Sequence, residues 1–126
     1  MVRINTVFFL IASSILLVVH LLATKLYLYW LFSWIDIPVH FLGGSVVALG
    51  VFSAYDLRLP LPKRWLSFVP VFLFVLMIAL AWEVYEIEIG IRIDANYVTD
   101  TLTDIFMGMF GGAVGYVVGN RLYSLK

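Results

Sequence analysis

Four long apolar stretches constrain the fold of this chain most strongly. They cover residues 4–24, 36–55, 66–86 and 100–119, and each is close to the ~20 residues that an α-helix needs to cross a hydrocarbon core. Since lipid offers no hydrogen bonds to the backbone, such segments must be helical. The chain is 63% hydrophobic, against roughly 45–50% for soluble proteins. We therefore predict an all-α integral membrane protein, in which residues 1–126 form a single domain with four transmembrane helices in one small bundle.

The segments next to these stretches are less regular. The first stretch resembles a signal peptide, but its apolar core over 7–23 is long and no small-residue cleavage site follows it, so we expect a retained span. Residues 25–35 are rich in Tyr and Trp, which is typical of a membrane–water interface. They either extend the first helix or lie along the surface. Residues 87–99 alternate apolar and polar side chains, which indicates a short hairpin or an extended loop.

The basic residues divide unevenly between the two sides of a four-span topology. Four spans place both termini and the loop between the second and third spans on one side. Six of the eight Lys and Arg residues fall there: Arg3, Arg58, Lys63, Arg64, Arg121 and Lys126. Lys25 and Arg92 fall on the other side. Because basic loops tend to stay in the cytoplasm, we expect a protein of the cell membrane with both termini cytoplasmic. The net charge of zero gives no reason to expect a nucleic-acid partner.

Three ionisable pairs lie at the ends of the later spans, on the side predicted to be external. The two members of each pair are three or four residues apart, which places both side chains on one helix face. The pairs are Asp36 with His40, Glu83 with Glu86, and Asp100 with Asp104. His20 reaches a similar depth, Glu88 and Asp94 fall in the external loop, and Asp56 is the acidic residue on the cytoplasmic side.

This convergence predicts a site, because five neighbouring carboxylates in a partly dry environment cannot all stay ionised without cations. We expect the six paired residues to be metal ligands, with Glu83 and Asp104 also catalytic. A carboxylate-rich set with an imidazole favours Mn, Fe, Mg or Ca, and Zn is compatible with it. The chain has no cysteine, so thiolate ligation is excluded.

Glycines continue the faces below the acidic residues. The fourth span carries Gly108, Gly111, Gly112, Gly115 and Gly119, and the second span carries Gly43 and Gly44. Stripes of this kind let helix backbones approach closely. We expect them to pack the bundle below the polar cluster, and glycine-rich faces of this kind are also candidates for homo-oligomer contacts.

Taken together, the motifs resemble the VanZ-like group of small multi-span bacterial membrane proteins. The resemblance rests on Asp36-x-x-x-His40-Phe-Leu-Gly-Gly, Trp82-Glu83-x-x-Glu86 and Asp100-x-x-x-Asp104 before a glycine-rich span, over residues 36–119. One departure from the group is that Met107 and Gly108 stand where relatives tend to have a polar residue. The resemblance implies a family associated with glycopeptide resistance, and it carries no agreed reaction.

Simpler interpretations exist for several members of the cluster. Asp36 and Asp100 are each well placed to cap a helix N-terminus, and Glu83 and Glu86 are compatible with an interfacial helix end. Three functions stay open. The first is a metal-dependent hydrolase or transferase acting on a membrane lipid or a lipid-linked substrate. The others are a proton- or cation-coupled transporter or channel, and a non-catalytic lipid-binding or accessory protein.

Overall fold

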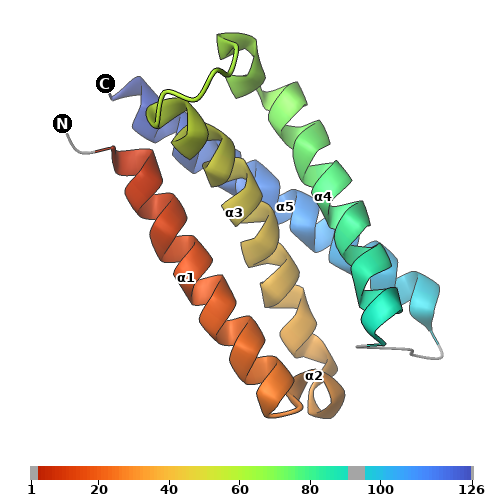
Figure 1. The fold of residues 1–126 in the computed structure, drawn as a ribbon. Coiled ribbons are helices and arrows are strands. Elements are labelled where there is room, and N and C mark those ends of the chain that lie inside the picture. The colour runs from red at the N-terminus through yellow and green to blue at the C-terminus, as the bar shows by residue number, and fades with distance from the viewer. Residues whose placement is uncertain (1–2, 91–95, 126) are drawn as a thin grey trace.

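The computed structural model describes residues 3–90 and 96–125, which form helices and, within those ranges, no strand. Figure 1 shows the long helices, which are α1 (Ile4–Lys25), α3 (Asp36–Asp56), α4 (Phe68–Ile89) and α5 (Tyr97–Ser124). All of them are long and apolar enough to cross a membrane. The predicted all-α architecture with four membrane-spanning helices is thus confirmed. Arg92, Asp94 and Lys126, which belong to the charge pattern of the predicted topology, lie outside the described residues.

Two of the predicted spans, 66–86 and 100–119, differ from the observed helices at both ends by two to five residues. The third span starts at Phe68 instead of residue 66 because residues Lys63–Leu66 form a 3-10 turn, η2. It continues to Ile89, where Gly90 ends the helix with a left-handed φ of 64°. α5 starts at Tyr97, not at residue 100, and runs on to Ser124. The hairpin or loop predicted for 87–99 is therefore wrong at both ends, where the residues are helical, and its middle, 91–95, lies outside the described residues. Glu88 belongs to the last turn of α4.

The aromatic segment 25–35 does not extend the first helix. The chain leaves α1 after Lys25, and Tyr27 adopts a left-handed φ of 56°, which ends any continuous helix at this point. A short helix, α2 (Leu28–Leu31), and a 3-10 turn, η1 (Ser33–Ile35), then lead into α3. Tyr29 is buried against Ala23 and Val39, so this turn ties the end of α1 to the start of α3.

The helix α3 is the centre of the bundle. It packs against α1, α4 and α5, and its longest contact is with α5. Both termini and the connection between α3 and α4 lie at one end of the molecule, and α2 lies at the other (Figure 1). Consequently the start of α3, the end of α4 and the start of α5 share the end that carries α2.

Backbone contact between α3 and α5 explains the two glycine stripes. A Cβ on Gly44 would overlap the carbonyl oxygen of Gly108, and one on Gly111 would overlap that of Phe41. Ser45 Oγ donates to the Gly111 carbonyl at 2.9 Å across this interface. The predicted packing inside the bundle is observed for Gly44 and for the glycines of α5, whereas a Cβ on Gly43 would meet no atom within 4 Å. Since the glycines of α5 are buried within the chain, a homo-oligomer would need a different face, and oligomerisation stays a prediction.

The outer surface of the bundle is apolar. Leu17, Leu73 and Phe106 are each more than half exposed, and large exposed apolar side chains like them occur on α1, α4 and α5, which surround α3. Such a surface is costly in water and is the expected boundary with lipid. A small internal cluster of Ala48, Val71 and Val75 joins α3 to α4.

Candidate metal centre

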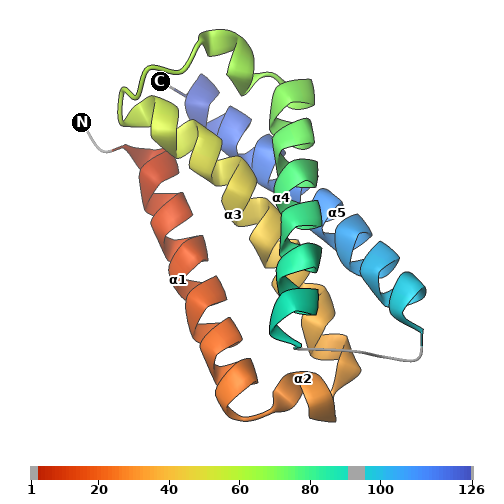
Figure 2. The same ribbon diagram turned by 45° about the vertical axis from the view of Figure 1, so that its right-hand side comes forward.

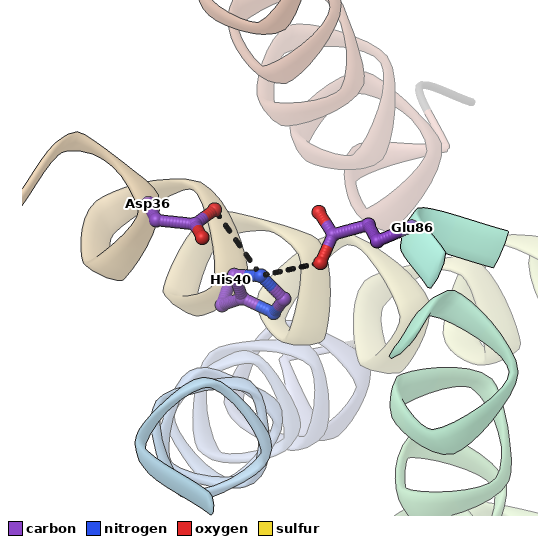
Figure 3. A group of neighbouring side chains, drawn as sticks. All are labelled: Asp36, His40 and Glu86. Carbon is purple, nitrogen blue, oxygen red and sulfur yellow. Dashed lines mark ion pairs between the residues drawn. The ribbon is translucent and has the colours of Figure 1, made fainter. Parts of the chain in front are cut away.

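His40 on α3 lies at the centre of the predicted cluster. Its Nε2 is 3.3 Å from Asp36 Oδ1, 3.9 Å from Glu86 Oε2 and 4.0 Å from Asp104 Oδ2. Its Nδ1 is 3.8 Å from Glu83 Oε1. Figure 3 shows the Asp36 and Glu86 carboxylates approaching the same ring nitrogen from two sides. One imidazole therefore connects carboxylates from α3, α4 and α5.

The antiparallel order of the helices produces this convergence. Asp36 and His40 are one turn apart at the start of α3, while Glu83 and Glu86 lie in the last turns of α4. Asp104 is in the second turn of α5. The N-termini of α3 and α5 carry the positive end of the helix dipole, which favours nearby anionic side chains. This arrangement offsets part of the repulsion among the acids.

The central members of the cluster are almost fully buried. Asp36 is 5% exposed, His40 6%, Glu83 7% and Asp104 3%. Burial of a charged group is costly unless it is paired or bound to a metal. Glu83 Oε1 and His40 Nε2 nevertheless have no hydrogen-bond partner among the described residues. Glu83 Oε1 lies near His40 Nδ1, and His40 Nε2 lies near the carboxylates of Asp36, Glu86 and Asp104, so a further ligand could be accepted beside either ring nitrogen.

Three overlapping groups in the cluster have the spacing of a metal site. Within each group, one ligand atom from every residue lies within 4.8 Å of the others. The groups are Asp36, His40 and Glu86; His40, Glu83 and Asp104; and Asp36, Asp100 and Asp104. All six residues singled out from the sequence are thus brought together. Asp36, His40 and Asp104 each belong to two groups, so they are the members that could be shared between neighbouring ion positions.

A second layer of aromatic side chains orients Glu86. Trp82 Nε1 donates to Glu86 Oε1 at 2.8 Å, which leaves Oε2 directed at His40. The Trp82 ring makes an edge contact with His20, at 5.5 Å between ring centroids. His20 Nδ1 in turn shares a 2.8 Å hydrogen bond with the Tyr29 hydroxyl. Burial, reinforced by the charges of Asp36 and Glu86, raises the pKa of Tyr29, so the phenol stays protonated.

This second layer was only partly visible in the sequence. His20 was singled out by depth alone, and the structure places it behind Trp82 and not among the carboxylates. Trp82 enters the sequence prediction only as part of the Trp82-Glu83-x-x-Glu86 motif, which does not include its role as a donor to Glu86. The signal that could have found it is the four-residue spacing between Trp82 and Glu86, which brings a donor and an acceptor together on one helix face.

The capping interpretation of the two aspartates is wrong. Ile35 occupies the N-cap position of α3 without a side-chain capping hydrogen bond, and Asp36 lies inside the first turn with its carboxylate near His40. The residue that caps α5 is Asn96, one turn before Asp100. Both aspartates are therefore helical residues that face the cluster.

The fold and the cluster together define a class: a four-span α-helical membrane protein with a buried acid–histidine cluster at one end of its bundle. The chain belongs to the family described as "Predicted membrane protein (DUF2238)", whose sequence profile matches residues 2–124. Neither a curated protein nor a solved structure matches the chain. The family match supports a membrane protein and does not extend to the VanZ-like resemblance.

Proposed function

We propose that the acid–histidine cluster binds a divalent metal cation. The observation that supports this most directly is Glu83 Oε1, a buried carboxylate oxygen without a hydrogen-bond partner among the described residues, 3.8 Å from His40. The Glu83 carboxyl group has a side-chain hydrogen bond with Thr101, but a buried carboxylate oxygen without a partner is costly, and a cation would satisfy Oε1 together with its neighbours. Among the described residues, the cationic partner placed between Glu83, Glu86 and Asp104 is the single imidazole of His40.

The distances around His40 Nε2 are compatible with ligands of one ion. In an octahedral site with ligands at ~2.1 Å, adjacent ligand atoms are ~3.0 Å apart and opposite ones ~4.2 Å apart. The carboxylate oxygens of Asp36, Glu86 and Asp104 lie 3.3 to 4.0 Å from Nε2, between these limits. The oxygen-rich ligand set favours Mn, Fe, Mg or Ca on hardness, with Zn as a further candidate.

The function that this site supports best is metal-dependent chemistry on a membrane lipid or a lipid-linked substrate. The bound cation would activate water or polarise a phosphoryl or acyl oxygen. In this proposal Glu83 and Asp104 hold the cation and move protons, and the site lies at the end of the bundle, where a lipid head group can reach it. A relationship to VanZ-like proteins is part of the same proposal and rests on the sequence motifs alone.

The proposed orientation places the site on the external face of the cell membrane. Arg3 and Arg121 lie near the two termini, and Arg58 and Lys63 lie in the connection between α3 and α4. These residues share the end of the molecule opposite α2 (Figure 1). By the preference for basic loops in the cytoplasm, the acid–histidine cluster faces outward.

Calorimetric titration of chelator-treated protein with Mn²⁺ and Zn²⁺ tests the metal site. Glu83→Gln removes one buried carboxylate charge with little change in shape, so cation affinity should fall strongly. Glu88→Gln is the matched control, because Glu88 is exposed on the same helix and lies outside the cluster. If both variants bind the cations as wild type does, or if wild type binds neither cation, the proposal fails.

A further inference from the structure

An apolar cavity lies directly below the acid–histidine cluster. It encloses about 400 Å³ between α1, α3 and α4, with Gly108 of α5 at its edge. This volume is within the ~300–1,000 Å³ of typical ligand pockets. Most of its walls are formed by Leu, Val, Ile, Ala and Gly residues. Water molecules need two to four polar partners each, and the walls offer few of them, so the cavity suits an apolar occupant.

The cavity has a polar end and an apolar end. His40, His20 and Trp82 line it beside the cluster, and Ser13 and Val75 line it farther along the bundle. The lining residues of α1 span His20 to Ser13, and those of α4 span Trp82 to Val75. Seven residues of helix correspond to ~10 Å, about a third of a hydrocarbon core ~30 Å thick. The cavity therefore runs from the site toward the middle of the membrane.

One side of the cavity faces the bilayer. α3 forms its floor, and α1 and α4 form its walls. α1 packs mainly on α3, whereas α4 packs on α5 and α3, and the two wall helices stand apart in Figure 2. Leu17, on the rim of the cavity, is 58% exposed. A lipid chain could thus enter sideways without passing through water.

We propose that this cavity holds one acyl chain of a membrane phospholipid, whose head group then lies at the acid–histidine cluster. The acyl chain is the favoured occupant because the open side faces the bilayer, where acyl chains are the main component. The head-group part rests on the proposed metal function, since five carboxylates would repel a phosphate unless a cation lay between them. The substrate class of the site would then be a phospholipid that is held by one of its acyl chains.

Gly43 allows the cavity to be filled without disturbing the helices. It lines the cavity, and a Cβ built on it meets no atom within 4 Å. Gly43→Leu should therefore place a side chain in the space that the acyl chain would occupy. Ala81→Leu is the matched control, because Ala81 is exposed on α4 and outside the cavity. Ala79→Leu narrows the same cavity from α4 and replaces Gly43→Leu if that variant loses its helical circular dichroism.

The test is photo-crosslinking in vesicles of phosphatidylcholine that carries a diazirine in one acyl chain, with labelled positions mapped by mass spectrometry. Wild type and Ala81→Leu should be labelled at cavity residues such as Val47 and Ile78, and Gly43→Leu should lose that label. Equal cavity labelling of Gly43→Leu and wild type, or wild-type label confined to outward residues such as Leu73, would overturn the proposal.

Two further arms of the experiment distinguish the acyl-chain proposal from a different lipid occupant and from the metal proposal. A diazirine-bearing polyprenyl phosphate replaces the phospholipid in the first arm, and cavity labelling by this probe alone would show that the acyl assignment is wrong. The second arm repeats the phospholipid experiment in EDTA. Cavity labelling of wild type that persists in EDTA supports the acyl-chain site independently of the metal. If, in addition, only Gly43→Leu loses the label, the acyl-chain site is supported even when the cluster binds no cation.

Discussion

Gly44→Ala should loosen both the bundle and the site, because Gly44 lies where α3 touches the backbone of α5. A Cβ at this position would overlap the Gly108 carbonyl oxygen. Its distance to the Gly108 carbonyl carbon would be 2.7 Å, whereas ordinary contact begins at 3.4 Å, so this distance is 0.7 Å too short. The obstacle is backbone, so the helices must move apart by at least that amount. Overpacking of this kind costs ~1–3 kcal/mol.

The same displacement should weaken cation binding. His40 is one turn before Gly44, and its Nε2 is already 4.0 Å from Asp104 Oδ2 on α5. If the helices separate by 0.7 Å or more, the distance between these two ligand atoms exceeds what one shared ion allows. A displacement of ~1 Å is enough to disable a site. We expect a lower midpoint in thermal unfolding in detergent, followed by circular dichroism, and weaker Mn²⁺ binding in calorimetry.

The neighbouring glycine supplies the control. Gly43→Ala adds the same methyl group one residue earlier, where nothing lies within 4 Å, and alanine is favoured over glycine in a helix by up to ~1 kcal/mol. It should leave the unfolding midpoint unchanged or raise it, with normal cation binding. Equal effects of the two substitutions would refute the reasoning that α3 and α5 are in backbone contact at Gly44.

Three further predictions concern the surroundings of the cluster. Trp82→Phe removes the donor to Glu86 and keeps most of the volume, so cation affinity should fall by about 10–100-fold; calorimetry against wild type checks this, and an unchanged affinity would show that Trp82 does not orient Glu86. In intact cells a membrane-impermeant maleimide should label Glu88→Cys and spare Ser124→Cys, a test made clean by the absence of native cysteine; the reverse pattern would invert the proposed topology. Acidification to about pH 5 should release the cation, because its carboxylate and imidazole ligands bind protons in competition with it, and binding that is insensitive to pH would argue against these ligands.

Much of the fold could be predicted because membrane-spanning helices can be recognised from the composition and length of apolar stretches. Four apolar stretches of sufficient length had to be helices, and their number fixed which ends lie together. That step alone brought Asp36, Glu83 and Asp104 toward one depth, and the structure places their carboxylates around His40. The glycine stripes could also be recognised from the sequence, since close backbone contact between helices requires small residues along one helix face.

The helix ends and the second layer around the site could not be predicted as well. In the sequence, the alternation after Glu86 obscured that α4 continues to Ile89, and helix ends vary by one or two residues with local geometry. The contact of Trp82 with both Glu86 and His20 depends on side-chain direction and on a neighbouring helix. The cavity is a still longer-range property, since it depends on how α1 and α4 are spaced across α3.

Elemental analysis of the purified protein tests the central claim most directly. Wild type, Glu83→Ala, Asp104→Ala and the exposed control Glu88→Ala would be prepared identically in metal-containing buffer and freed of unbound ions. We expect a divalent metal in stoichiometric amount in wild type and Glu88→Ala, and its loss in Glu83→Ala and Asp104→Ala with helical circular dichroism retained. Wild type without metal, or equal metal content in all four proteins, would contradict it.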